Sequence, residues 1–218
     1  IRFSRQKEIV RTSVHGYLGC MCGRYALAQE HEALKIRYGF IDAPLSAFHQ
    51  TPRYNIAPTQ LAAVITNGAG MKLVGMRWGL IPHWAKDPAI GNSLINARSE
   101  TAPEKPSFRD SFKKYRCLIP ATGFYEWKKS ADGKSKQPYF IRVKNEEVFS
   151  FAGLWSSWHD RLQGSEVLSY TILTTDPNEF MKNVHHRMPV ILTRDAEKLW
   201  LSHDADSDSL KRLLVPCS

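Results

Sequence analysis

The stretch Met21-Cys22-Gly23-Arg24-Tyr25 holds the most distinctive reactive group of this chain. If translation starts at Met21 and the methionine is removed, Cys22 carries a free α-amine and a thiol on adjacent carbons. Such a 1,2-aminothiol attacks an aldehyde with nitrogen and then closes a thiazolidine ring with sulfur. An α-amine has a pKa of about 7.7–8.0, so roughly a tenth of it is neutral and nucleophilic at pH 7. The alternative is that Cys22 is a small buried residue near a strand, as most free cysteines are.

A second candidate cluster is Asn96-Ala97-Arg98-Ser99-Glu100, which follows a strand-like run. Side chains alternate along a strand, so Asn96 and Arg98 share one face. Their amide and guanidinium are suited to orienting a reacting group and to gripping phosphate. A solvated strand edge explains the same pattern equally well.

A third cluster is Gly123-Phe124-Tyr125-Glu126-Trp127. A carboxylate between large aromatic residues tends to lose its hydration, which raises its pKa toward the range useful in acid–base catalysis. The alternative is that Glu126 points outward from an amphipathic strand. Because Phe124 and Glu126 share a face, a pocket is favoured.

The fourth cluster is Val184-His185-His186-Arg187-Met188-Pro189. Consecutive histidines rarely bind one ion, and no further cysteine or histidine cluster completes a site, so we predict no metal. His185 as a proton shuttle, with Arg187 contacting phosphate or carboxylate, is the better interpretation. His83, beside Trp84, is expected to line a groove. Cys22, His185 and Asn96 together also have the composition of a cysteine hydrolase.

Composition restricts the class of protein. The chain has 218 residues, which suits one domain with a substantial core, and a net charge of +9, which suggests a polyanionic partner such as nucleic acid. The four cysteines match neither a zinc spacing nor a dense disulfide framework, which indicates a reduced, intracellular protein. No run approaches eighteen apolar residues, so we expect no membrane association.

The predicted elements indicate an α+β domain around a curved, mostly antiparallel sheet. Helices are predicted in residues 29–40, where Gly39 is the stop signal, and in residues 107–115, 177–184, 195–202 and 208–214. Residues 42–58 are predicted to be a proline-punctuated loop. Strands are predicted at residues 61–66 and 71–78, joined as a hairpin by Asn67-Gly68, and at 93–98, 116–120, 123–128, 138–143, 148–155, 167–174 and 189–192.

Six motifs in this order resemble the SRAP family, the SOS-response-associated peptidases also described as abasic-site processing proteins. They are Met21-Cys22-Gly23-Arg24-Tyr25, Arg53-Tyr54-Asn55-Ile56-Ala57-Pro58, Arg77-Trp78-Gly79-Leu80-Ile81-Pro82, Asn96-Ala97-Arg98-Ser99-Glu100, Gly123-Phe124-Tyr125-Glu126-Trp127 and His185-His186-Arg187-Met188-Pro189. The resemblance extends from Met21 to about Leu214. It implies a single α+β domain with a barrel-like sheet.

The resemblance also implies an abasic-site sensor that binds single-stranded DNA and crosslinks to it through the N-terminal cysteine. Carried over by motif, Cys22 is the nucleophile, Asn96 orients, Glu126 assists imine formation and ring opening, and His185 handles protons at the sugar. The implied DNA contacts are phosphate binding by Arg24, Arg98 and Arg187, and a groove lined by Asn55, Pro58 and Trp84. Peptidase activity through the cysteine, a possible DNA lyase activity and the absence of a cofactor are implied as well.

Residues 1–20 are basic and are expected to be a leader, a propeptide or an extension of cloning origin, followed by the SRAP-like domain at residues 21–218. Cys22 has no free amine while they are present, so self-cleavage by Cys22 is one expected route to remove them. The chain stops at Ser218, short of the closing strand expected for the family. We expect a monomer in the cytoplasm at the nucleoid, or in the nucleus. The rival functions are a thiol peptidase and a non-catalytic single-strand-binding module.

Overall fold

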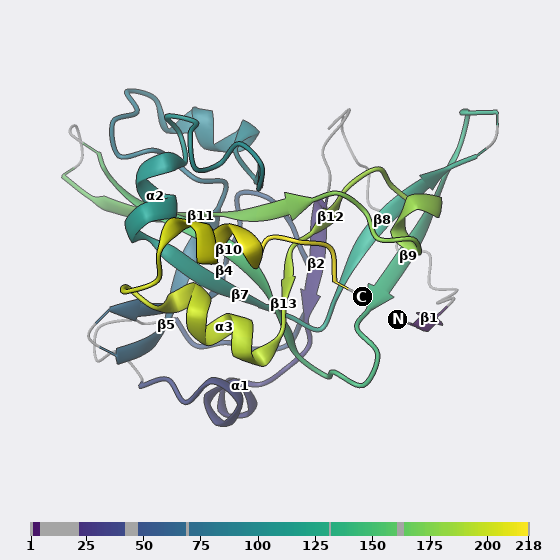
Figure 1. Cartoon of the computed structure of the whole chain (residues 1–218), viewed down its shortest axis with the longest axis horizontal. Coiled ribbons are helices and arrows are strands. Elements are labelled where there is room, and N and C mark those ends of the chain that lie inside the picture. The colour runs from purple at the N-terminus through teal and green to yellow at the C-terminus, as the bar shows by residue number, and fades with distance from the viewer. Residues whose placement is uncertain are drawn as a thin grey trace.

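The computed structural model describes residues 2–4, 22–41, 48–68, 70–130, 132–160 and 164–217. Their central feature is a closed five-stranded barrel (Figure 1). Strand β11 (Glu166–Thr175) closes the barrel. It pairs antiparallel with β10 (Phe149–His159) along one edge and parallel with β5 (Gly70–Trp78) along the other, and every other pair of neighbouring barrel strands is antiparallel. The predicted α+β fold with a mostly antiparallel, barrel-like sheet is therefore confirmed. The barrel strands are β4 (Leu61–Gly68), β5 (Gly70–Trp78), β7 (Arg116–Ala121), β10 (Phe149–His159) and β11 (Glu166–Thr175).

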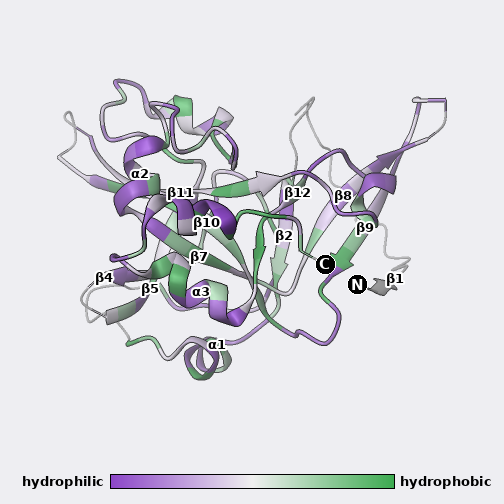
Figure 2. Cartoon of the chain, in the orientation of Figure 1, coloured by the Kyte–Doolittle hydropathy of each residue, from purple (hydrophilic) through white to green (hydrophobic). Residues whose placement is uncertain are grey.

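A smaller sheet lies beside the barrel and carries three of the six motifs, those that contain Cys22, Asn55 and Glu126. Its β8–β9 hairpin projects away from the barrel, with a hydrophilic tip and a more hydrophobic base (Figures 1 and 2). Cys22 lies just before β2, and Glu126 lies within β8. In spatial order the strands are β1 (Arg2–Ser4), β9 (Lys136–Arg142), β8 (Gly123–Lys129), β2 (Arg24–Leu27) and β3 (Arg53–Ile56).

Tyr25 joins the smaller sheet to the barrel. Its ring packs edge-on against Trp78 and Phe151, with centroid distances of 5.3 and 5.9 Å. Its hydroxyl lies 2.8 Å from that of Tyr170, and all four residues are completely buried. Aromatic pairs of this geometry contribute about 0.5–1.5 kcal/mol each beyond the area they bury. Because Tyr25 follows Cys22 by three residues, these contacts fix the start of β2 against the barrel.

The described part of the chain has four α-helices, all of them in segments predicted to be helical. Gly39 ends the first one with φ of +64°, the left-handed conformation that glycine adopts without steric cost, and its N–H donates to the carbonyl of Lys35. The side chain of Thr193 caps the third by accepting the N–H of Ala196. The helices are α1 (His31–Tyr38), α2 (Arg109–Lys114), α3 (Arg194–Leu201) and α4 (Ser207–Arg212).

Two local predictions are wrong. Residues 177–184 form no α-helix; only the 3-10 turn η2 (Met181–Asn183) is present. Asn178 caps it by accepting the N–H of Met181, and the N–H groups of Val184 and His185 both donate to the carbonyl of Met181, so the hydrogen bonds end after a single turn. The predicted loop at 42–58 contains β3, because Ile56 is buried opposite Tyr25 while the prolines flank the strand.

Two predicted strands are shorter than expected. Residues 93–98 contain only β6 (Asn96–Arg98), preceded by the 3-10 turn η1 (Pro88–Ser93). Residues 189–192 are divided between β12 (Met188–Pro189) and β13 (Ile191–Leu192). Val190 separates the two strands because its backbone hydrogen bonds go to two different partners. Its N–H donates to the carbonyl of Leu173 in β11, and its carbonyl accepts the N–H of Ala152 in β10. No helix among the described residues has the length and apolarity needed to cross a membrane.

Candidate active site

Cys22 and Glu126 are in contact across the smaller sheet, although 104 residues separate them in the chain. The backbone N–H of Cys22 donates a hydrogen bond to Oε1 of Glu126 at 2.8 Å, and both residues are buried. The β2–β8 register brings them together, since it pairs Arg24 with Tyr125 directly beside Glu126. The nitrogen that becomes an α-amine in a chain starting at Cys22 therefore lies against a carboxyl group.

The backbone of Cys22 is strained. Its φ of +35° lies in the left-handed region, which costs a residue other than glycine about 1–2 kcal/mol. The φ angle is defined by the carbonyl carbon of the preceding residue. A chain that begins at Cys22 has no such dihedral, so removal of the preceding residues relieves this strain completely.

Glu126 is only 3 % exposed, as its aromatic neighbours led us to expect. Loss of hydration raises the pKa of its carboxyl to about 7, and the hydrogen bonds from the N–H groups of Cys22 and Trp127 oppose that rise only in part. At neutral pH the group is close to half protonated. It is therefore able both to accept and to donate a proton at the nitrogen of Cys22.

The motifs containing Asn96 and His185 meet at the end of β11. Thr174 pairs with Arg98 of β6 and also with Pro189 of β12, so these two short strands lie on opposite edges of β11. Asn96 pairs with Ile172, two residues earlier on the same strand. Segments about 90 residues apart in the sequence are thus held at one strand end by backbone pairing.

His185 is half-buried and stacks on His186 with 4.3 Å between ring centroids. Burial, and then the charge of His186, lower the pKa of His185 below its ordinary value. Its Nδ1 contacts the backbone of Arg187, at 3.2 Å from the nitrogen and 3.3 Å from the carbonyl oxygen. These contacts orient the ring, and the lowered pKa keeps it neutral at pH 7.

Arg187 is buried, and its guanidinium binds protein acceptors. Glu100 accepts two parallel hydrogen bonds from it at 2.7 and 2.8 Å, and Asp176 accepts one at 2.7 Å. The carbonyl of Thr174 accepts a fourth at 2.7 Å. These acceptors raise the pKa of Arg187 in spite of its burial. The two carboxylate partners agree with the contact predicted from the residues, whereas the phosphate contact implied by the resemblance stays a prediction. The arrangement favours a role in holding the His185 segment on β11.

The other predicted DNA contacts lie at the surface. The guanidinium of Arg24 donates to Oδ1 of Asn55 at 3.0 Å, which joins two predicted contact residues. Arg98 is exposed, Pro58 is half-buried, and Trp84 is 49 % exposed with its indole N–H donating to the carbonyl of Pro106 at 3.4 Å. The structure thus joins Cys22 to Glu126 and Arg24 to Asn55, and places Asn96, Arg98 and Arg187 along one strand end.

Two sets of site residues escaped the sequence analysis. The buried hydroxyl pair of Tyr25 and Tyr170 adjoins the Cys22 segment, and no local pattern indicates such a long-range contact. Glu100 and Asp176 form ion pairs with Arg187. The one available signal for Glu100 was its position in the motif that contains Arg98, and nothing in the sequence indicated Asp176. Among the described residues, no three His, Cys, Asp or Glu side chains are grouped as metal ligands.

Comparisons with known proteins agree over nearly the whole chain. Residues 21–218 match the family model described as SOS response associated peptidase (SRAP). The abasic site processing protein YoaM of Bacillus subtilis is 46% identical over 198 residues, which cover 90% of this chain and 86% of the relative. The abasic site processing protein HMCES of Xenopus tropicalis is 33% identical over 69% of this chain and 53% of the relative. A crystal structure of a Bacteroides thetaiotaomicron protein superposes with a TM-score of 0.85 at 32% identity, covering 90% of this chain and 88% of that one.

Proposed function

The chain belongs to the SRAP family, and we propose that it captures abasic sites in single-stranded DNA by forming a covalent thiazolidine through Cys22. The observation that carries this proposal is the 2.8 Å hydrogen bond between the nitrogen of Cys22 and the buried carboxyl of Glu126. The relatives are named abasic site processing proteins. An abasic deoxyribose in its open form is an aldehyde, which is the group that a 1,2-aminothiol traps.

The first step is attack by nitrogen. In a chain that begins at Cys22, the α-ammonium, with a pKa of about 7.7–8.0, transfers a proton to Glu126. Burial raises the pKa of this carboxyl, to about 7 while the nitrogen of Cys22 is an amide, and so brings it toward that of the amine. The neutral amine adds to the aldehyde carbon and gives a carbinolamine. Glu126 returns its proton to the hydroxyl group, which leaves as water, and an imine remains.

The second step is attack by sulfur. Sγ of Cys22 adds to the imine carbon and the thiol proton passes to nitrogen, so the thiazolidine forms with a net loss of one water. His185 supplies the earlier ring opening of the sugar by accepting the proton of the C1′ hydroxyl and returning one to the ring oxygen. Asn96 orients the sugar. The imine intermediate also permits elimination of the 3′ phosphate, which is the basis for a lyase activity.

Binding of the DNA strand rests on charge. The net charge of +9 attracts phosphates, and Arg24 and Arg98 are the surface arginines closest to the proposed chemistry by their strand positions. Asn55, Pro58 and Trp84 line the groove in which the strand bends. The affinity falls as salt rises, because each neutralised phosphate releases counterions. We propose that the protein does this as a monomer, in the cytoplasm or the nucleus.

A second activity, self-cleavage before Cys22, is favoured by the strained φ of that residue. The thiol of Cys22 gives its proton to Glu126 as Sγ attacks the carbonyl carbon of Met21. Glu126 passes this proton to the amide nitrogen, which leaves as an amine. Water then hydrolyses the thioester, so Met21 gains a carboxylate and Cys22 keeps its thiol. The free amine produced here is the nucleophile of the crosslink.

Intact-mass measurement of the purified chain tests both activities. It is made before and after mixing with a single strand that carries one abasic site, and a strand with a tetrahydrofuran analogue, which has no aldehyde, is the matched control. We expect a chain that begins at Cys22 and gains the mass of the abasic strand less one water. A chain that begins upstream and gives no adduct contradicts self-cleavage. A chain that begins at Cys22 and gives no adduct contradicts capture and favours a peptidase or a plain DNA-binding module.

A further inference from the structure

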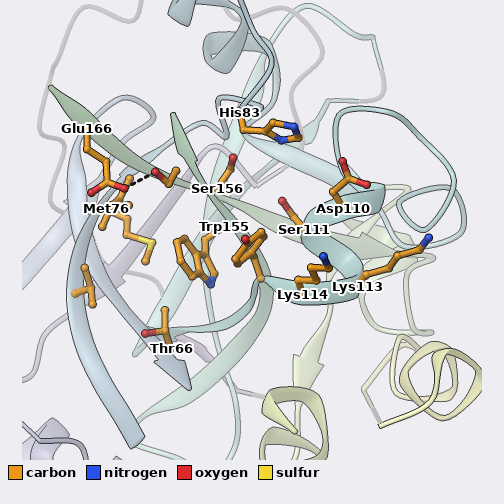
Figure 3. Close-up of a pocket in the computed structure, with 14 residues that line it drawn as sticks. Thr66, Met76, His83, Asp110, Ser111, Lys113, Lys114, Trp155, Ser156 and Glu166 are labelled. Carbon is orange, nitrogen blue, oxygen red and sulfur yellow. Dashed lines mark hydrogen bonds between the residues drawn. The ribbon is translucent and has the colours of Figure 1, made fainter. Parts of the chain in front are cut away.

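A cavity of about 730 Å³ opens at the end of the barrel where β11 begins (Figure 3). Strands β4, β5, β10 and β11 form its wall, and α2 lies at its rim. Sites for small organic ligands typically enclose about 300–1,000 Å³. The size of this cavity therefore suits a single nucleotide.

The cavity is separate from the proposed active site. Glu166, which lines it, precedes Thr174 by eight residues on β11, and Thr174 pairs with Arg98. With an extended rise of about 3.3 Å per residue, these positions lie about 26 Å apart along the strand. His83, which was expected to line a groove, is among the described residues that line the cavity, whereas none of the residues predicted for catalysis or for direct DNA contact is. The function proposed at Cys22 therefore leaves this cavity unassigned.

The middle of the cavity offers a flat aromatic surface. Trp155 is half-buried at its centre (Figure 3), and the ring of Tyr115 packs edge-on against it with centroids 4.9 Å apart. Met76 and Leu168 add apolar surface. Any nucleobase can stack on such a platform, because every base has a π-face.

The two sides of the cavity differ in charge (Figure 3). On one side, the carboxylate of Glu166 accepts a hydrogen bond from the hydroxyl of Ser157 at 2.5 Å. On the other, Lys113 and Lys114 extend from the last turn of α2, and neither forms an ion pair with any residue that the structure describes. Asp110 on the same side lies 3.7 Å from the guanidinium of Arg109, which offsets its charge.

We propose that this cavity binds one nucleotide unit, with the base on Trp155, the phosphate at Lys113 and Lys114, and the base edge at Glu166. A carboxylate accepts hydrogen bonds and donates none when ionised. Guanine presents two adjacent N–H donors on its pairing edge and thymine presents one, so the site prefers guanine. The nucleotide comes either from free solution or from a DNA strand.

Isothermal titration of the full chain tests the proposal with dGMP, dTMP and inorganic phosphate as separate ligands. The test variant is Lys113→Gln/Lys114→Gln, and the control is Lys144→Gln/Lys198→Gln, which removes the same charge from exposed positions outside the cavity. We expect dGMP to bind more tightly than dTMP or phosphate. The test variant should bind it about tenfold more weakly, because it lacks the two charges that face the phosphate, and the control should bind it as the parent does.

A second arm identifies the source of the nucleotide with an intact single strand that has no abasic site. If dGMP does not bind but a guanine-containing strand binds the test variant about tenfold more weakly than the control variant, the nucleotide belongs to a strand. If both lysine variants bind every ligand equally, the proposal is wrong. Neither arm uses an aldehyde, so failure here leaves the capture chemistry at Cys22 untouched, and failure of capture leaves this site untouched.

Discussion

The nitrogen of Cys22 lies 2.8 Å from Oε1 of Glu126, inside a part of the protein where the carboxyl is almost inaccessible to water. Burial moves the pKa of this carboxyl to about 7, close to the range of about 7.7–8.0 in which an α-amine loses its proton. In the proposed reaction, in which Cys22 carries a free amine, burial of Glu126 reduces the free energy of proton transfer between the two groups. Imine formation needs a group of this kind, because the nitrogen must lose a proton before it attacks the aldehyde and the hydroxyl group must gain one before it leaves as water.

Burial of an ionisable group at this position costs stability, and Glu126→Gln should recover it. An unfolded glutamate has a pKa of 4.5 and the folded one about 7, so the folded chain holds the extra proton between these values. Stability consequently falls as the pH rises through that window and stays low above it. Glutamine remains neutral and still accepts the N–H of Cys22. We expect the variant to be more stable than the parent at pH 8, by at most about 3 kcal/mol, and equal to it at pH 4.

Urea unfolding at the two pH values measures this difference. Glu147→Gln, at an exposed position, is the control and should show no difference at either pH. Equal stabilities of the Glu126→Gln variant and the parent at pH 8 would show that the carboxyl is hydrated. The same variant should capture an abasic strand more slowly, since it has lost its proton acceptor.

Cys22→Ser separates covalent capture from binding. When the chain of this variant begins at the substituted position, it keeps the α-amine and still forms an imine, but it has no thiol to close the thiazolidine. We expect no adduct on a denaturing gel, while borohydride, which reduces an imine, should restore one. The affinity for the strand should change little. Cys217→Ser, which also removes a thiol, is the control and should crosslink like the parent.

Local signals in the sequence account for much of the fold. Gly39 marks the end of α1, and β4 and β5 pair as the hairpin that Asn67-Gly68 predicted, although these two residues belong to β4 itself and pair with Met71 and Gly70. The helix predicted at 177–184 is wrong because its hydrogen bonds end after one turn, where the N–H groups of Val184 and His185 both donate to the carbonyl of Met181. Strand β3 escaped prediction because its pairing with β2 outweighs the flanking prolines.

The site was predictable only in part for the same reason. Cys22 and Glu126 each carry recognisable chemistry, but their contact depends on the pairing of β2 with β8, which no local pattern encodes. The partners of Arg187 were missed because Glu100 and Asp176 come from different segments that meet only at the end of β11. Sequence identified the reactive groups; topology decides which of them touch.

The stacked pair His185 and His186 provides a prediction about pH. Burial and the charge of His186 hold the pKa of His185 below its ordinary value. Replacing His186 with glutamine removes the second cause, so the pKa of His185 should rise, and NMR titration of the ring measures it. In a plot of capture rate against pH, the acidic limb should shift to higher pH by the same amount. His159→Gln, at an exposed position, should leave both unchanged, and an unshifted His185 in the His186→Gln variant would exclude the interaction.

Arg98 and Arg187 lie at the same end of β11, yet they should respond differently to substitution. Arg98 is exposed, so Arg98→Ala should weaken strand binding uniformly and reduce the slope of log affinity against log salt by about 0.7, the loss of one phosphate contact. Arg187 is held by Glu100, Asp176 and Thr174, and lysine cannot reproduce its paired hydrogen bonds to Glu100. Arg187→Lys should therefore lower stability by about 1–3 kcal/mol and slow capture by releasing His185, without altering the salt slope. A slope that falls as it does for Arg98→Ala would instead place Arg187 on a phosphate, and would mean that its two carboxylate partners release it when DNA binds.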